Sequence, residues 1–362
     1  MEFDDVLRLD DFAVAARARL PHAVWDYIEG GSGAELTIAA NRSAFDDVRI
    51  APRMLVDVSG ADASTCILGA PVRSPIGIAP TAYQELVHPG AETDMVAGAA
   101  GHLSVLSFFA SRTIEDIAAH AAGPLWLQLY WLERRAALAD MVARAEAAGF
   151  AAIVLTVDAP RIGRRLRDMR NGFAIPAEIR AVNLDHGLTD SVHDSIAGSS
   201  GLAVQAQQTF DQTITWSDLA WLRGRTALPL VLKGLLTGYD AHLAVEAGAT
   251  GIIVSNHGGR QVDGAVSTLH ALPDIVDAVA GRATVLLDGG VRSGRDAFIA
   301  LALGADGVLL GRPPLWALAA GGAAGVEHML AVIDAELTHL MALAGRPSLK
   351  DITTDSIFRG TP

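Results

Sequence analysis

Residues 228–258 read LPLVLKGLLTGYDAHLAVEAGATGIIVSNHG, and this stretch decides the fold. Two apolar runs, 228–234 and 251–258, flank a predicted helix at 239–249 that ends at a glycine before the second run. Because each run is apolar on successive residues instead of alternating ones, both faces of each strand should be covered. The stretch therefore predicts two parallel strands joined by a helix.

Eight such runs occur along the chain, and most of them are followed by a segment of helical character. Eight strand-then-helix units favour a (β/α)₈ TIM barrel, because its closure leaves no exposed strand edge. A doubly wound open sheet is the alternative. The runs span residues 75–80, 103–109, 125–130, 151–158, 228–234, 251–258, 284–290 and 307–313, and further helices are predicted at 134–150 and 294–305.

The chain is predicted to form a single α/β domain over residues 1–362. Residues 1–62 should be a mostly helical N-terminal segment, and residues 75–345 should form the barrel. The connection after the fourth strand is much too long for an ordinary crossover and is rich in Ser, Asp and Gln. We therefore predict a mobile loop at about residues 175–215, acting as a lid or leaving the compact domain.

Composition argues against several classes of protein. A formal net charge of −13 disfavours binding to a nucleic-acid backbone, which needs clustered Lys and Arg. The single cysteine, Cys66, excludes an intramolecular disulfide framework and fits a reducing compartment. The first residues lack the features of a signal peptide, and no uninterrupted apolar run is long enough to span a bilayer. We predict a cytoplasmic protein without metal, membrane or nucleic-acid partners.

Polar side chains follow all eight predicted strands. In a barrel of this kind the C-terminal strand ends meet at one rim, where reactive groups lie. A capped or solvated strand end is the ordinary explanation for one such residue, whereas eight together favour a functional site. In chain order the side chains are those of Thr81, Ser107, Gln128, Tyr130, Thr156, Asp158, Lys233, Ser255, His257, Arg260, Asp288, Arg292 and Arg312.

The ends of the last two strands predict a ligand that carries a phosphate. DGGVRSGRD (288–296) and LLGRP (309–313) combine glycines, which let backbone N–H groups approach an anion, with the charges of Arg292 and Arg312. The alternative is a pair of tight turns that lead into helices.

The remaining rim residues suggest acid–base chemistry on a small acid. Arg165 and Arg260 offer planar guanidinium groups to a carboxylate, and Asp158 would orient His257 and raise its basicity. Lys233 ends an apolar strand, where an unpaired ammonium group would be costly. It would form a Schiff base, stabilise negative charge on a cofactor, or pair with a carboxylate.

Eight segments of the chain resemble the FMN-dependent α-hydroxy acid oxidases and dehydrogenases. The set is very specific in its order, and the likeness extends from about Tyr27 to the LKDI sequence near the C-terminus. The segments are YIEGGSG (27–33), IAPTAYQELVHPGAE (78–92), LQLY (127–130), LTVDAPRIGRRLRD (155–168), LVLKG (230–234), SNHGGRQVD (255–263), DGGVRSG (288–294) and ALGADGVLLGRP (302–313).

The resemblance implies a role for each rim residue. His257 would be the catalytic base supported by Asp158, Tyr130 would bind the substrate hydroxyl, and Lys233 would stabilise the reduced flavin. The substrate carboxylate would be held by Tyr27, Arg165 and Arg260. The implied FMN contacts are Ala79, Pro80, Thr81, Ser107, Gln128, Thr156, Lys233 and Ser255, with phosphate and ribityl contacts from Asp288, Gly289, Gly290, Arg292, Gly311 and Arg312.

The family likeness also implies the reaction, which is oxidation of an (S)-2-hydroxy acid to the 2-keto acid. Phe108, Phe109 and Tyr83 depart from the family pattern and suggest a pocket for a larger, aromatic substrate such as mandelate or 4-hydroxymandelate. Ala82 favours an oxidase that reduces O₂ to H₂O₂. Relatives form tetramers or octamers, so a homo-oligomer is expected.

Several alternatives remain at this point. A dehydrogenase or a monooxygenase of the same family would use another electron acceptor or release another product. An aldolase would use Lys233 as a Schiff-base nucleophile. A thiol mechanism of the inosine monophosphate dehydrogenase type is disfavoured because Cys66 precedes the first barrel strand. A barrel that only binds a metabolite has little use for so many ionisable groups at one rim.

Overall fold

The computed structural model describes residue 3 and residues 5–184, 190–193 and 208–359. Eight parallel strands form a closed barrel in the order β10-β11-β4-β5-β6-β7-β8-β9. The predicted (β/α)₈ TIM barrel is confirmed, and the alternative of an open sheet is wrong. The strands are β4 (Ile76–Ile78), β5 (Leu103–Leu106), β6 (Leu125–Leu129), β7 (Ala152–Thr156), β8 (Leu230–Leu235), β9 (Gly251–Val254), β10 (Thr284–Asp288) and β11 (Gly307–Leu310).

The strands are buried on both faces, as their continuous apolar sequences predict. Alternate side chains, such as that of Trp126, fill the inside of the barrel as one cluster. A hairpin of β2 (Thr65–Ile67) and β3 (Ala70–Val72) adds Ile67 and Val72 to this inner cluster at the N-terminal end of the barrel. The barrel is therefore a packed core at this end, and the opposite rim is the place for a ligand.

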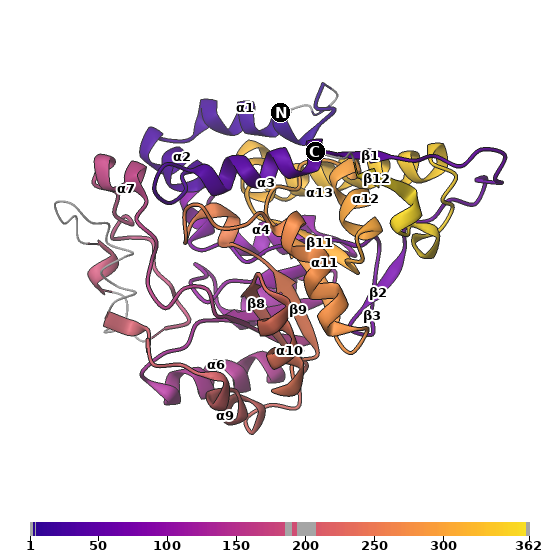
Figure 1. Ribbon diagram of the computed structural model, residues 1–362. Helices are drawn as coiled ribbons and strands as arrows, with labels where there is room; N and C mark the ends of the chain where they lie inside the picture. The colour runs from indigo at the N-terminus through magenta and orange to yellow at the C-terminus, as the bar shows by residue number, and fades with distance from the viewer. Residues whose placement is uncertain (1–2, 4, 185–189, 194–207, 360–362) are drawn as a thin grey trace.

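Helices cover the outside of the barrel between successive strands (Figure 1). The predicted helices at 134–150, 239–249 and 294–305 correspond to α6, α10 and α12. The outer helices are α4 (Ala91–Gly98), α5 (Ile114–His120), α6 (Arg135–Ala147), α7 (Leu166–Asn171), α9 (Leu219–Arg223), α10 (Gly238–Glu246), α11 (Thr268–Val279), α12 (Gly294–Ala302) and α13 (Arg312–Leu343).

The N-terminal segment is helical over a shorter range than predicted. It contains α1 (Leu9–Arg19), α2 (His22–Glu29) and α3 (Leu36–Asp46), and then β1 (Val48–Ile50), which pairs with β12 (Ile357–Arg359). No helix lies between β1 and residue 62. The segment was predicted to be mostly helical, and β1 is a strand because β12, more than 300 residues away in sequence, supplies its partner.

The N-terminal helices pack over the rest of the chain. Helix α1 packs on α13, α2 on α7, and α3 on the turn His257–Gly259. Figure 1 shows these three helices together on one side of the barrel. Their placement brings the C-terminal end of α2, with Tyr27, to the rim where the predicted site residues lie.

The predicted mobile loop at 175–215 lies partly outside the described residues, because 185–189 and 194–207 are not described. Some of its described residues are packed against the protein, and others, such as Gln212 and Thr213, are exposed. The Ile175 N–H donates to the Val192 carbonyl at 3.3 Å, and both side chains are buried. Phe210 is buried and pairs with Leu132 in an isolated β-bridge. The mobility of the loop stays a prediction.

Helix α13 is long and apolar enough to cross a membrane by length and composition alone. However, 61% of its apolar 18-residue window is buried inside the structure, where the helix packs against α1, α4 and α12. The helix is also interrupted at Gly321 and Gly322, whose backbone angles are not helical. Packing in the core explains the apolar composition of this helix.

Candidate active site

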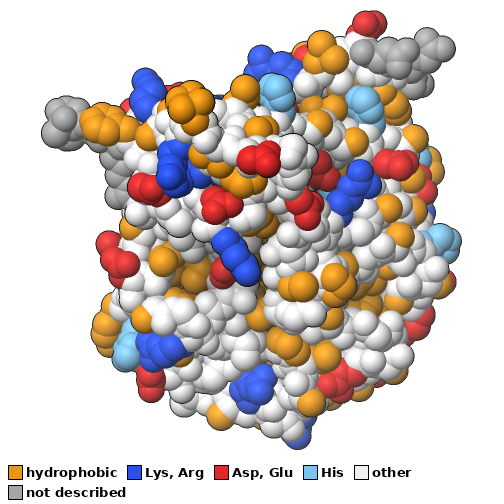
Figure 2. All heavy atoms as spheres, turned by 90° about the vertical axis from the view of Figure 1, so that its right-hand side faces the viewer, with side chains coloured by type: hydrophobic (Ala, Val, Ile, Leu, Met, Phe, Trp, Pro, Cys, Tyr) orange, Lys and Arg blue, Asp and Glu red, His pale blue; other side chains and the backbone are white. Residues whose placement is uncertain are grey.

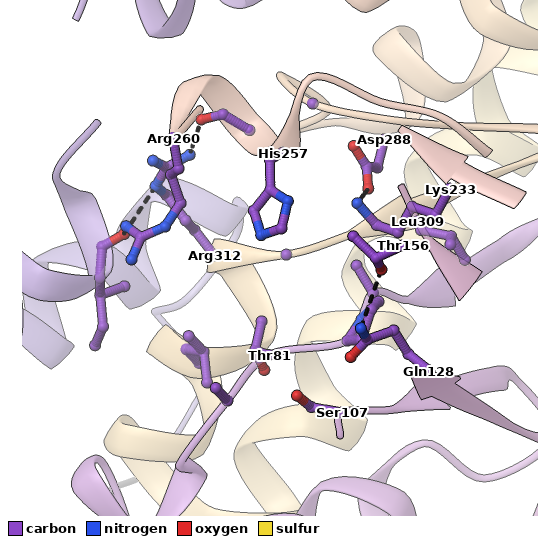
Figure 3. A pocket seen from close by; sticks show the side chains of 18 of the residues that line it. Thr81, Ser107, Gln128, Thr156, Lys233, His257, Arg260, Asp288, Leu309 and Arg312 are labelled. Carbon is purple, nitrogen blue, oxygen red and sulfur yellow. Dashed lines mark hydrogen bonds and ion pairs between the residues drawn. The ribbon is translucent and has the colours of Figure 1, made fainter. Parts of the chain in front are cut away.

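A cavity opens at the C-terminal ends of the barrel strands (Figure 3). Asp158 and Ser255 do not line it; Ser255 lies beside it, where its Oγ accepts a hydrogen bond from Nζ of Lys233 at 2.7 Å, and its FMN contact stays a prediction. The predicted site residues that line the cavity are Tyr27, Ala79, Pro80, Thr81, Ser107, Gln128, Tyr130, Thr156, Arg165, Lys233, His257, Arg260, Asp288, Gly289, Gly290, Arg292, Gly311 and Arg312.

His257 points into the cavity, between the two arginines Arg260 and Arg312 on one side and Lys233 on the other (Figure 3). Its Nδ1 lies 2.9 Å from Oδ1 of Asp158. Attraction to His257 and Lys233 lowers the pKa of the Asp158 carboxyl although its burial acts in the opposite direction. Because the carboxylate accepts a hydrogen bond from the Nδ1–H group, Nε2 carries no proton and is the basic nitrogen that faces the cavity.

The β-bulge in β8 makes room for this pair. The register of β8 against β9 shifts between Lys233 and Leu235, around Gly234 with φ of +111°. A Cβ atom on Gly234 would lie 2.6 Å from the side chain of Asp158. Only glycine combines this backbone angle with the close passage of Asp158 toward His257.

Lys233 forms a buried ion pair at the cavity wall. Its Nζ lies 2.9 Å from Oδ2 of Asp288 and donates a hydrogen bond to Oγ of Ser255 at 2.7 Å. Burial would lower the pKa of the Lys233 ammonium, but Asp288 and Asp158 outweigh it and raise that pKa. A protonated amine is a poor nucleophile, so this geometry argues against a Schiff-base aldolase and for an electrostatic role.

Arg260 is held in place by the C-terminal end of α2. Its Nη1 donates to the carbonyl oxygens of Tyr27 at 2.6 Å and Gly30 at 2.7 Å, and its guanidinium lies 5.1 Å from the centre of the Tyr27 ring. The carbonyl end of a helix attracts cations. Arg260 therefore faces the cavity in a fixed position, with the rest of its guanidinium group available to a carboxylate.

Arg165 also lines the cavity but is held much less firmly. Burial and the nearby positive charge of Arg260 lower the pKa of Arg165 to about 10, so it remains protonated at neutral pH. Its Nη1 lies 4.0 Å from Oδ2 of Asp168. The two guanidinium groups together form the anion-binding end of the cavity.

The predicted phosphate end contains two buried arginines and two glycine turns. Burial lowers the pKa of Arg292 to about 10 and that of Arg312 to about 9, so both stay charged at neutral pH. Gly289 and Gly290 have φ of +92° and +91°. A Cβ on Gly290 would lie 2.3 Å from the carbonyl oxygen of Asn41, so no other residue fits there.

Arg312 makes contacts that the sequence did not reveal. Its three guanidinium nitrogens donate to the carbonyl oxygens of Ile28, Gly258, Glu29 and Gly30 at 3.0–3.3 Å. Arg312 therefore also fastens the end of α2 to the barrel rim. Helix α13 starts directly at Arg312 without a side-chain cap, which leaves its first N–H group for an anion.

The polar wall between these ends is fixed by its own hydrogen bonds. Oε1 of Gln128 accepts from the N–H of Phe108 at 3.1 Å, and its Nε2 donates to Oγ1 of Thr156 at 3.0 Å. Oγ of Ser107 accepts from the N–H of Phe109 at 3.2 Å. These side chains from three successive strands are thus preorganised around the cavity.

Sequence reasoning missed most of the apolar lining. Ile28, Ile162, Val291, Leu309 and Leu315 line the cavity, and their sequence positions carry no signal that separates them from core residues. Of the three aromatic departures, only Phe109 lines the cavity. Tyr83 and Phe108 are fully buried and pack against Phe109, so they act on the pocket through Phe109.

The cavity fits FMN by shape and by chemistry. Its glycine turns and buried arginines suit the phosphate group, and its middle wall of amide and hydroxyl groups suits the edges of a flat heterocycle. Lys233 places a positive charge where a reduced, anionic ring needs one. Such a barrel, with a carboxylate-supported imidazole facing the anion-binding end, defines a flavin-dependent oxidoreductase of acids.

The comparisons with known proteins agree with this class. The chain belongs to the FMN-dependent dehydrogenase family, whose model matches residues 16–359, and FMN is its cofactor. It is 45% identical to L-lactate oxidase of Nostoc sp. (96% of this chain, 97% of that protein) and 44% identical to glycolate oxidase of Spinacia oleracea (98% and 96%). The crystal structure of mandelate oxidase with (S)-4-hydroxymandelic acid is 43% identical, with a TM-score of 0.94 over 98% of this chain and 100% of that one. The predicted family, cofactor and enzyme class are confirmed.

Glu92 connects two of the loops that carry the cavity wall. Its Oε1 accepts hydrogen bonds from the N–H groups of Gln84 at 3.2 Å and Ser111 at 3.0 Å, which follow β4 and β5. Burial raises the pKa of Glu92 to about 7 against the opposing effect of these hydrogen bonds. The side chain is 1% exposed, so its charged form is poorly solvated.

We expect Glu92→Gln to stabilise the protein at neutral and alkaline pH much more than at acidic pH. The folded-state pKa lies above the ordinary value of 4.5, so ionisation costs stability increasingly as the pH rises from about 4.5 to about 7. A neutral glutamine keeps the accepting oxygen and avoids a cost of about 3 kcal/mol at pH 8.5. Urea unfolding of the wild type and the variant at pH 5 and pH 8.5 measures the difference in their free energies of unfolding. A stability difference that does not change with pH would contradict the assignment.

Proposed function

We propose that the protein oxidises an aromatic (S)-2-hydroxy acid, mandelate or 4-hydroxymandelate, to the 2-keto acid and reduces O₂ to H₂O₂. The observation that carries the proposal is an aromatic wall on one side of the cavity. Phe109 and Tyr130 line the cavity, and their ring centres lie 5.6 Å apart. Phe210 stacks on Tyr130 at 4.6 Å, and Tyr83 stacks on Phe109 at 5.7 Å.

The charged groups would orient such a substrate. Arg165 and Arg260 bind the carboxylate, while the aromatic wall receives the side chain at C2. Burial raises the pKa of the Tyr130 phenol well above its ordinary range, so Tyr130 remains a hydrogen-bond donor to the substrate oxygen.

His257 carries out the proton transfer in the reaction. Its Nε2 takes a proton from the substrate, and the carboxylate of Asp158 at Nδ1 stabilises the resulting imidazolium. FMN, when bound, supplies the acceptor of the two electrons. The buried ammonium of Lys233 then stabilises negative charge at the cavity wall.

A smaller substrate is the second candidate. The 45% and 44% identities to an L-lactate oxidase and a glycolate oxidase support a 2-hydroxy acid with a small side chain. The mandelate oxidase structure, which superimposes with a TM-score of 0.94, supports the aromatic one. Electron acceptors other than O₂, as in a dehydrogenase, and a monooxygenase outcome are the alternatives for the second half-reaction.

A substrate panel tests the proposal. We would mix the holoenzyme with glycolate, L-lactate, (S)-mandelate and (S)-4-hydroxymandelate, and measure both anaerobic flavin bleaching and aerobic H₂O₂. The proposal expects the highest kcat/KM for the two aromatic acids and stoichiometric H₂O₂. A preference for glycolate or lactate would overturn the substrate assignment. Bleaching without H₂O₂ formation in air would overturn the oxidase assignment.

Phe109→Ala should separate aromatic from small substrates. Loss of a ring at the cavity wall removes about 2 kcal/mol of contact with an aromatic side chain, so KM for mandelate should rise about 30-fold. KM for lactate should change less than threefold, because lactate does not reach this wall. Tyr239→Ala, at an exposed position of α10, is the matched control. Equal changes for both substrates would show that Phe109 does not select the side chain.

We also propose that the protein works as a cytoplasmic homo-oligomer, a tetramer or an octamer. Met54, Leu55 and Phe358 are exposed hydrophobic residues, and Leu55 has no shielding at all. Figure 2 shows hydrophobic side chains interspersed with charges of both signs on one face of the molecule. Light scattering of the purified holoenzyme tests this proposal, and a monomer would overturn it.

A further inference from the structure

A buried carboxylate that has no role in the mechanism above lies behind the anion-binding end of the cavity. Asp168 stands in the first turn of α7 and is 0% exposed. Neither of its carboxylate oxygens has a hydrogen-bond partner among the described residues. An ionised carboxylate in such a place is costly unless a cation compensates it, so the position calls for an explanation.

The nearest cation is one of the two guanidinium groups of the site. Nη1 of Arg165 lies 4.0 Å from Oδ2 of Asp168, which is an ion pair without a hydrogen bond. Arg165 is itself buried, and its Nε has no hydrogen-bond partner in the described part of the chain. Burial raises the pKa of Asp168, while Arg260 and Arg165 act in the opposite direction.

The two arginines therefore differ in how they are held. Arg260 is fastened by the carbonyl oxygens of Tyr27 and Gly30 at 2.6 and 2.7 Å. Arg165 has only Asp168, at a distance that a small side-chain movement would turn into a hydrogen bond. Arg165 can therefore pair with either of two carboxylates, that of Asp168 or that of a bound substrate.

We propose that Asp168 is a positioning residue that competes with the substrate carboxylate for Arg165 and thereby limits how tightly acids are held. The inference rests on the proposed function in that the substrate is a carboxylate. Without Asp168 the cavity would present two positive charges that no protein carboxylate compensates. With it, the 2-keto acid product faces a protein anion that favours its release.

The test measures the binding of acids that carry no oxidisable hydroxyl. Oxalate and phenylacetate would be titrated into the holoenzyme and its Asp168→Asn variant, with the flavin absorption spectrum as the readout. Asparagine keeps the shape and removes the charge, so both acids should bind about tenfold more tightly. The neutral probe 2-phenylethanol should bind equally to both proteins. Unchanged or weaker binding of oxalate to the variant would overturn the proposal.

Two further variants complete the experiment. In an Arg165→Leu background, Asp168→Asn should raise the affinity for oxalate by much less than tenfold, because only the effect of the Asp168 charge on Arg260 then remains. A tenfold gain in oxalate affinity from Arg165→Leu to the double variant would show that Asp168 does not act through Arg165. Asp306→Asn changes a carboxylate at the opposite end of the barrel, which accepts from the Val285 N–H at 2.8 Å, and should leave affinity unchanged.

The arms also separate this inference from the proposed function. If Asp168→Asn does not fold, the smaller neutral variant Asp168→Ser is measured in its place with the same expectation. Binding of oxalate does not depend on an aromatic substrate. A tenfold effect on oxalate together with no binding of phenylacetate would therefore support the role of Asp168 and count against the aromatic substrate alone.

Discussion

His257→Gln is expected to lower the rate constant of anaerobic flavin reduction about 10³- to 10⁴-fold while FMN stays bound. The imidazole faces the cavity with Nδ1 committed to Asp158, so Nε2 is the basic nitrogen in reach of a substrate. Glutamine has a similar size but no basic nitrogen at neutral pH. Stopped-flow absorbance with saturating (S)-mandelate measures the rate, and the flavin spectrum before mixing reports the bound FMN.

The chain offers a matched control for this substitution. His102 is also paired with a carboxylate, with its Nε2 2.9 Å from Oδ2 of Asp334, but it is more deeply buried than His257 and does not line the cavity. His102→Gln should reduce its flavin at nearly the wild-type rate. If His257→Gln kept its rate within threefold of the wild type, His257 would lose its assignment as the base.

Lys233→Met is expected to destabilise the protein by about 3–5 kcal/mol, the typical cost of removing one partner from a buried ion pair. The substitution leaves Asp288 buried with no cation at 2.9 Å and removes the positive charge that helps to keep Asp158 ionised. Methionine fills a similar volume, so the loss reports charge more than packing. Urea unfolding with excess FMN, followed by far-UV circular dichroism, measures it.

A second substitution tests whether the unpaired carboxylate is the cause. Lys233→Met/Asp288→Asn should recover most of the lost stability, because no buried charge is then left alone. The chain has one other lysine, Lys350, which is exposed, and Lys350→Met should change stability little. If the double variant were as unstable as Lys233→Met, the loss would arise from packing or from the bond to Ser255.

Much of the fold could be predicted from sequence because parallel barrel strands have a plain signature. Strands buried on both faces must be apolar at successive positions, so residues 151–158 and 284–290 already contained β7 and β10. The polar residues at their ends follow from the same rule, since all strands point to one rim. The common location of these residues at one rim could therefore be predicted from the sequence without knowledge of any contact between them.

Other features depend on contacts between distant residues and were missed. The segment after residue 46 forms a strand because residues 357–359 supply its partner. Tyr83 and Phe108 are aromatic residues near the rim in sequence, yet packing places them behind Phe109. Hydrophobic residues read the same in a sequence whether they face a core or a ligand.

The sequence by itself determined the barrel, the rim and the chemical types of the groups on it, because these depend on local apolar patterns and on strand direction. Only the tertiary structure decided which group each one meets. It paired Lys233 with Asp288 and Ser255, fastened Arg260 and Arg312 to the carbonyl end of α2, and left Arg165 beside Asp168. The charge state and freedom of an ionisable side chain are set by its neighbours in space, and those neighbours lie up to hundreds of residues away in the chain.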